Sequence, residues 1–172
     1  MSEIGRFNYF KAVLEKAPAI LLVISVLNEF DFNYLNLKYF SFNFPFILIY
    51  YWSLKRPGNI GYGLIFLCGL LNDVVVGLPI GISALSYLLI CGFSAYIRNI
   101  TLRPNLIKYW IFFGFSILTV NSIAYVVINL FFNIEVVYAD ILVNILFTFL
   151  LYVILSKIFD YYHRLIFGAL YA

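Results

Sequence analysis

The stretch CGLLNDVVVGLPIGISALSY, residues 68–87, poses the question on which the architecture depends. It is almost entirely apolar, yet it carries the adjacent polar residues Asn72 and Asp73 together with three glycines and a proline. A carboxylate inside an apolar segment is costly unless protein or water surrounds it. The role of Asp73 therefore depends on whether the chain is dissolved in water or in lipid.

The composition of the whole chain is that of a membrane protein. Of the 172 residues, 65% are hydrophobic and 11% are charged, whereas soluble domains have about 45–50% apolar and about 25% charged residues. Too few polar groups are available to cover a surface in water. We therefore expect an all-α, polytopic membrane protein in which residues 1–172 form a single integral membrane domain.

The chain contains six apolar segments that are candidates for membrane spans. A spanning helix needs about 20 mostly apolar residues. The breaks between segments include KRPG at 55–58 and RNITLRPN at 98–105, which combine charges with helix-breaking residues. Four or five spans is the alternative if the first or second segment does not cross. The predicted spans are residues 17–30, 35–54 (interrupted by Pro45), 60–76, 78–97, 106–132 and 137–159.

The placement of the charges predicts an orientation. If residue 1 is cytoplasmic, six spans leave only Lys38 among the eleven Lys and Arg residues on the outer side. Basic residues are enriched in cytoplasmic loops. The pattern therefore favours an even number of spans in an inner membrane, with both termini in the cytoplasm. The acidic residues predicted for the opposite side are Glu29, Asp31, Asp73, Glu135 and Asp140.

The short connections leave no room for a soluble catalytic module. The sequence has no His-Glu-x-x-His, no phosphate-binding Gly-Lys-Ser/Thr loop, no Cys-x-x-Cys and no Gly-x-Ser-x-Gly. The cysteines Cys68 and Cys91 lie in apolar runs and are expected to be small buried side chains. We therefore expect no enzymatic activity, no catalytic or metal-binding residues, no cofactor and no nucleic-acid partner.

Two interpretations of Asp73 follow from this topology. Asn72 and Asp73 fall near the periplasmic end of the third predicted span, and Gly77, Pro79 and Gly81 form the turn into the fourth. In the first interpretation, Asp73 caps the next helix or accepts backbone N–H groups exposed at the turn. In the second, Asn72 and Asp73 line a polar pocket or contact a span of another subunit. The residues alone favour neither.

Two segments of the chain resemble a known family. FNFPFILIYYWSLKRPG (42–58) and GLIFLCGLLNDVVVGLPIGISALSYLLI (63–90) are similar to MreD, the rod shape-determining membrane proteins of bacteria. That family has a proline entering the second span, a Tyr-Trp pair near its cytoplasmic end, and a Gly-Leu-x-x-Asp-x-x-x-Gly-x-x-x-Gly pattern. Asn72 stands where the family usually has an apolar residue. The candidate structural or partner-binding motif is therefore Pro45, Tyr51, Trp52, Gly69, Asn72, Asp73, Gly77, Pro79 and Gly81.

The resemblance implies a fold similar to the substrate-binding membrane subunits of energy-coupling vitamin transporters. It implies a non-enzymatic scaffold of the cell-elongation machinery, which builds lateral peptidoglycan and sets cell shape. The implied partners are MreC directly, MreB and the peptidoglycan synthases indirectly, and membrane lipid. We further expect Asn72 and Asp73 to order the turn so that a cavity or groove forms on the periplasmic side. The alternative function is a vitamin-like solute-binding subunit of an energy-coupling transporter.

Overall fold

The computed structural model of the chain describes residues 16–27, 42–101, 105–132 and 138–167. All regular secondary structure in these residues is helical, which confirms the predicted all-α class. The segments 28–41, 102–104 and 133–137 lie outside the described residues, and so does Lys38. The helices are Lys16–Leu27, α2 (Phe44–Lys55), α3 (Tyr62–Val76), α4 (Ile82–Ile100), α5 (Leu106–Phe132) and α6 (Tyr138–Phe167).

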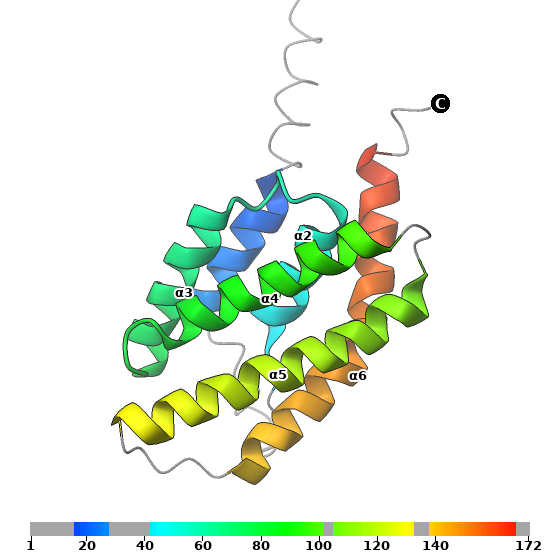
Figure 1. Cartoon of the computed structure of the whole chain (residues 1–172). Helices are drawn as coiled ribbons and strands as arrows, with labels where there is room; N and C mark the ends of the chain where they lie inside the picture. The colour runs from blue at the N-terminus through cyan, green and yellow to red at the C-terminus, as the bar shows by residue number, and fades with distance from the viewer. Residues whose placement is uncertain (1–15, 28–41, 102–104, 133–137, 168–172) are drawn as a thin grey trace, which may run out of the picture.

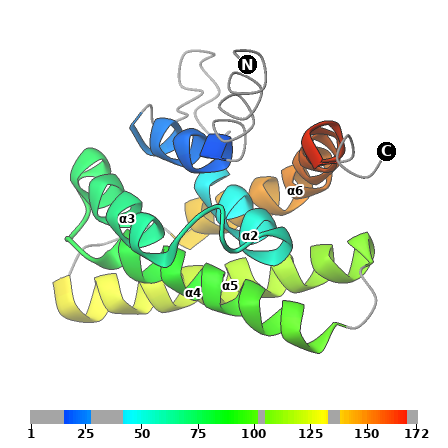
Figure 2. The same ribbon diagram turned by 90° about the horizontal axis from the view of Figure 1, so that it is seen from above.

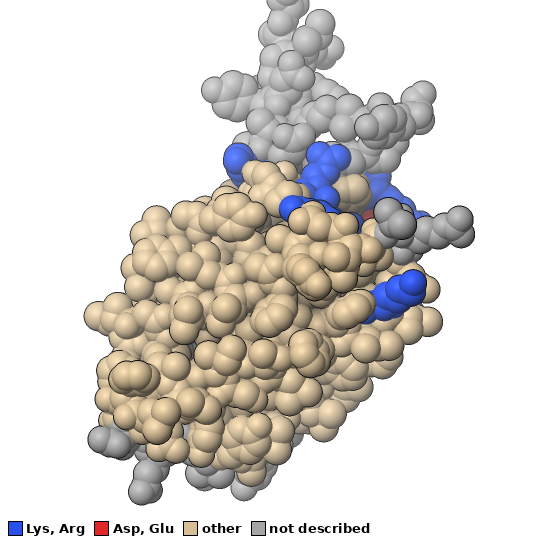
Figure 3. Space-filling view, in the orientation of Figure 1, with Lys and Arg blue, Asp and Glu red and all other residues tan. Residues whose placement is uncertain are grey.

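The helices run alternately between two ends of the molecule (Figure 1). One end is formed by the C-termini of α2, α4 and α6 and the N-termini of α3 and α5, and we call it the charged end. The other is formed by the C-termini of α3 and α5 and the N-termini of α2, α4 and α6, and we call it the turn end. On the visible face the Lys and Arg side chains gather at the charged end, and the remaining surface carries almost no charge (Figure 3).

Helix α2 lies in the middle of the bundle, between α3 and α6 and over α4 and α5 (Figure 2). Every residue from Phe46 to Leu54 is buried, so this helix has no exposed face. Its 12 residues extend about 18 Å at ~1.5 Å per residue, which is less than the roughly 30 Å of a hydrocarbon core. Protein, and not solvent or lipid, therefore surrounds α2.

The start of α2 corrects the sequence prediction. Residues 35–54 were expected to form a span that Pro45 interrupts, but the helix begins at Phe44 and Pro45 lies in its first turn. Proline is tolerated there because its missing N–H has no helical partner to lose. Asn43 caps the helix, because its side-chain oxygen accepts a hydrogen bond from the Phe46 N–H at 3.2 Å.

The later helices follow the predicted segments, with ends that differ by up to eight residues. The bounds of α5, Leu106–Phe132, are those predicted. Helix α4 begins at Ile82 instead of residue 78, because the residues before it form the turn from α3. Helix α6 continues to Phe167 beyond the predicted end at residue 159, since no helix-breaking residue interrupts DYYHRL.

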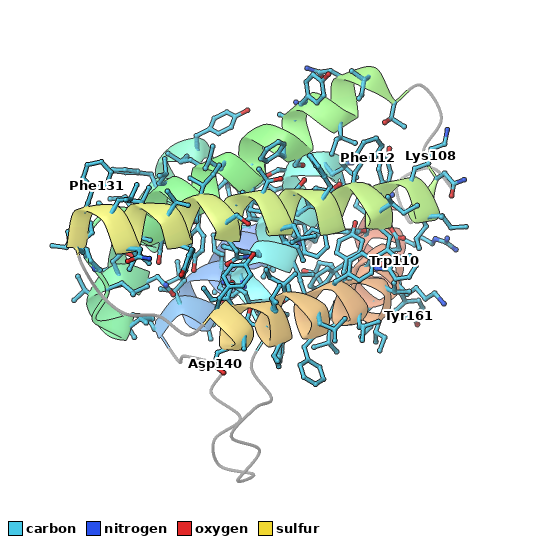
Figure 4. All side chains as sticks on the ribbon, turned by 60° about the horizontal axis from the view of Figure 1, so that its bottom comes forward. Lys108, Trp110, Phe112, Phe131, Asp140 and Tyr161 are labelled. Atoms are coloured by element: carbon cyan, nitrogen blue, oxygen red, sulfur yellow. The ribbon has the colours of Figure 1, made fainter. Side chains whose placement is uncertain are left out.

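Among the described residues, two helices are long and apolar enough to cross a membrane, Leu106–Phe132 and Tyr138–Arg164. They lie side by side, with Lys108 and Tyr161 at one end and Phe131 and Asp140 at the other (Figure 4). Many of their large apolar side chains are exposed, including Phe115 at 63%, as lipid contact requires. The segments Lys16–Leu27 and Tyr62–Val76 are apolar but shorter. The six-span count stays a prediction.

Candidate functional site

The hairpin formed by α3 and α4 contains most of the candidate motif. Helix α3 ends at Gly77, which adopts the left-handed conformation at φ 75°. The Leu78 N–H donates to the Asp73 carbonyl at 2.9 Å, the bond that closes a Schellman-type helix end. Gly81 precedes α4 at φ 107°, a conformation that residues with a Cβ rarely adopt. The two glycines therefore allow the turn that reverses the chain, with Pro79 between them.

The carboxylate of Asp73 ties the two helices together across this turn. Its side chain is 0% exposed. One oxygen accepts the Gly81 N–H at 2.6 Å, and the other accepts the Ser83 N–H at 2.8 Å. The first N–H groups of a helix lack intrahelical partners and carry the positive end of the helix dipole. Asp73 thus caps α4 from the end of α3, the geometry of the first interpretation.

Gly69 allows the two helices of the hairpin to touch. A Cβ atom at this position would lie 2.3 Å from the Cα of Ala84 on α4. Backbone atoms cannot move aside as the end of a flexible side chain can, so only glycine fits this contact. Close approach through small residues is a main source of helix association in lipid, where no hydrophobic force drives helices together.

Asn72 differs from its neighbour Asp73 in what it faces. Its Nδ2 donates to the Ser83 hydroxyl at 2.9 Å, and the residue lines a cavity of about 500 Å³ at the turn end. Asp73 is not among the residues that line this cavity. The two interpretations from the sequence thus separate: the cap is formed by Asp73, and the pocket lining includes Asn72.

The cavity lies where all six described helices approach the turn end, and each contributes to its lining. The described residues of the lining combine amide, hydroxyl and aromatic side chains, and none of them is Asp, Glu, Lys, Arg or His. Pro45 also lines it, at the start of α2. The polar and tyrosine residues of the lining are Ser25, Asn43, Asn72, Ser83, Ser86, Tyr87, Asn121, Tyr125 and Asn144.

Sequence reasoning did not single out Asn121 and Asn144, although a signal was present. Each is an asparagine inside a long apolar helix, α5 or α6. Polar side chains within membrane helices usually face other helices or a cavity. Only the fold, however, brings these two residues to the same cavity as Asn72.

The remaining motif residues lie toward the charged end of α2. The Tyr51 hydroxyl donates to the Asp160 carboxylate of α6 at 2.6 Å, and the Lys55 Nζ lies 3.3 Å from the same oxygen. Trp52 is buried, and its ring centre lies 6.4 Å from that of Phe159. These residues join α2 to α6 and are not part of the turn-end cavity.

The chemistry that these groups offer is hydrogen bonding and packing. Within the described ranges, no three His, Cys, Asp or Glu residues come together as a possible metal site. Cys68 and Cys91 are both buried and free, and the Cys91 sulfur lies 3.2 Å from the Ser53 hydroxyl. The Ser86 hydroxyl donates to the Ile82 carbonyl of its own helix at 2.8 Å.

Comparison with protein-family models finds a match to the rod shape-determining protein MreD over residues 16–162. Comparison with curated proteins and with solved structures gives no match. The expected fold similarity to vitamin transporter subunits therefore stays a prediction. The family match spans the described helices from Lys16 into the C-terminal part of α6.

Proposed function

Because the chain belongs to the MreD family of rod shape-determining proteins, we propose that it is a non-enzymatic scaffold of the machinery that elongates rod-shaped bacterial cells. The match over residues 16–162 carries this proposal. The family is one of shape-determining proteins and is not known for an enzymatic activity. Neither the family match nor the solved structures support the alternative of a solute-binding transporter subunit, and a transport function is not proposed.

The proposal includes a location in the inner membrane, with six spans and both termini in the cytoplasm. It is supported by the alternating directions of the helices and by the gathering of Lys and Arg side chains at one end (Figures 1 and 3). Basic residues mark the cytoplasmic side, so the charged end faces the cytoplasm and the turn end faces the periplasm.

The short helix α2 is compatible with six spans because protein surrounds it. In lipid, the backbone groups at the end of a short helix would have no hydrogen-bonding partners. At the turn end, Asn43 and Pro45 at the start of α2 instead border the polar cavity. Non-helical backbone at membrane depth is tolerated where it lines such a cavity. The polar cavity thus gives the backbone at the start of this short helix hydrogen-bonding surroundings that lipid would not provide.

We expect the direct partner to be MreC, with MreB and the peptidoglycan synthases associated through that complex. The described helices offer a partner in the membrane large exposed apolar surfaces on α3, α5 and α6. A transmembrane partner associates with such surfaces by close packing and a few polar contacts. The charged end offers exposed basic side chains such as Lys108 and Lys157 to the cytoplasmic side.

Affinity purification of the full chain in mild detergent tests the proposal. We expect MreC to co-purify. Photoreactive amino acids at Leu67 of α3, Phe115 of α5 and Leu150 of α6, all exposed, would then identify the contacting face by cross-linking. The same probe at Ile49, which is 0% exposed in α2, serves as the matched control and should give no cross-link. Absence of MreC from the purified material would contradict the proposal.

A further inference from the structure

The turn-end cavity is a polar space in a membrane protein, and its polar lining extends beyond the start of α2 to α3, α4, α5 and α6. Its four asparagines come from three helices and from the N-cap of a fourth: Asn72 on α3, Asn121 on α5, Asn144 on α6 and Asn43 before α2. Placing an amide in an apolar environment without a hydrogen-bonding partner costs about 1–3 kcal/mol. Each of these asparagines has a partner within the protein, so a ligand would use only the hydrogen-bonding capacity that those partners leave.

The internal hydrogen bonds of the cavity leave capacity for a ligand. An asparagine amide has two N–H donors and two acceptor lone pairs on its oxygen. Asn72 uses one donor for the Ser83 hydroxyl at 2.9 Å. Asn121 uses one donor for the Ile117 carbonyl at 2.8 Å in its own helix. Both amides can therefore donate to and accept from a molecule in the cavity.

Aromatic rings complete the lining. Tyr87 packs edge-on against Phe46 with 5.7 Å between ring centres. Tyr125 packs edge-on against Tyr138 at 5.1 Å. Tyr87, Phe46 and Tyr125 all line the cavity. Tyr87 and Phe46 are 1% and 4% exposed, so they form a closed wall of the cavity. Tyr125 is half-buried and adds a ring that carries a hydroxyl group. Amide groups beside aromatic faces suit a ligand with a ring that is apolar on its faces and polar at its edge.

We propose that this cavity is a binding site for an uncharged molecule that carries hydroxyl and amide groups on a single ring, such as an N-acetylated sugar. The volume of about 500 Å³ lies within the roughly 300–1,000 Å³ of small-molecule pockets. None of the described residues that line the cavity is charged, so these residues offer no counter-charge to an ionised ligand. The carboxylate of Asp73 is already engaged by two backbone N–H groups.

A binding titration on the purified full chain in detergent tests this site. The probe is N-acetylglucosamine, and the matched comparison is glucosamine, which replaces the neutral acetamido group with an ammonium group. We expect saturable binding of N-acetylglucosamine and binding of glucosamine that is at least tenfold weaker. Lack of saturable binding, or equal affinity for the two sugars, would overturn the proposal.

Variants locate the site. Asn121→Leu keeps a similar side-chain volume but removes the amide, and it should weaken N-acetylglucosamine binding at least fivefold. Thr119→Val on the same helix is the control, because Thr119 does not line the cavity and its hydroxyl bonds the Phe115 carbonyl. If Asn121→Leu does not yield folded protein, Asn72→Leu replaces it. Unchanged affinity in the folded asparagine variant would place the ligand elsewhere and overturn the proposal.

The inference goes beyond the scaffold role and does not rest on it. Recovery of MreC with the same variants separates the two. We expect Asn121→Leu to lose sugar binding and to retain MreC, because Asn121 lines the turn-end cavity and not the exposed apolar surface of α5. Failure of the chain to bind MreC would contradict the scaffold role and leave the sugar titration unaffected.

Discussion

Asp73 at the turn end of the bundle and Asp160 at the charged end are stabilised in different ways. Asp73 at the turn end is 0% exposed and is bonded only to backbone N–H groups. Asp160 at the charged end has a side chain that is 30% exposed, and it meets the Lys55 ammonium and the Tyr51 hydroxyl. The first is held by the chain's own turn, and the second by a cation and a phenol from another helix.

The two aspartates also differ in how far along the chain their hydrogen-bonding partners lie. The partners of Asp73 lie 8 and 10 residues away, on the other side of one turn. The Tyr51 partner of Asp160 lies 109 residues away and meets it only after α2 and α6 pack. Asp73 therefore stabilises a hairpin, whereas Asp160 stabilises the assembled bundle.

Removal of the Asp73 carboxylate should have the largest effect. Asp73→Ala leaves the Gly81 and Ser83 N–H groups without acceptors, which costs on the order of 2–5 kcal/mol in the free energy of unfolding. Asp73→Asn keeps one acceptor oxygen and should lose less. Unfolding by SDS in mixed micelles measures both. Equal unfolding free energies for wild type and Asp73→Ala would contradict the conclusion that Asp73 stabilises the hairpin.

Gly69→Ala should have the next largest effect, because its Cβ would lie 2.3 Å from the Ala84 Cα and force α3 and α4 apart. We expect a loss of about 1–3 kcal/mol in the free energy of unfolding, as for other overpacked sites. The control is Gly92→Ala on α4, where a Cβ would meet nothing within 4 Å. That variant should be neutral or more stable by about 0.5–1 kcal/mol. Equal effects of the two substitutions would contradict the close contact.

Asp160→Asn tests the charged end. The amide still accepts the Tyr51 hydroxyl, but the ion pair with Lys55 is lost, and we expect a cost of about 0.5–1 kcal/mol. Salt screens partly exposed charges, so the difference from wild type should shrink at high ionic strength. The cost of Asp73→Asn, by contrast, should not depend on salt. Unfolding free energies of both variants at low and high salt compare the two ends directly. A salt-dependent cost at Asp73 would contradict the conclusion that the two aspartates are stabilised in different ways.

Asn72→Leu should have the smallest effect, although it is the neighbour of Asp73. It removes one side-chain bond, to the Ser83 hydroxyl, and such bonds between membrane helices contribute about 0.6 kcal/mol on average. The free energy of unfolding in mixed micelles measures the change. A loss as large as that of Asp73→Ala would mean that Asn72 belongs to the structure of the turn and is more than a lining residue.

Several features could be predicted from the sequence because their causes are local. Apolar composition indicated helices and a membrane environment, and α5 has its predicted bounds. Gly77, Pro79 and Gly81 predicted the turn between α3 and α4 because glycine and proline limit which conformations follow. The start of α2 was missed, since an apolar run does not reveal that Pro45 opens a helix when Asn43 caps it.

By itself, the sequence determined the helical class, the position of the α3–α4 turn and the MreD resemblance, because apolar length, turn residues and motif spacing are properties of neighbouring residues. Only the tertiary structure decided that α2 is buried on every side, that Asp160 meets Tyr51, and that Asn72 faces a cavity while Asp73 does not. Burial and cavities arise from side chains of several helices at once. No pattern along one helix specifies what the others place against it.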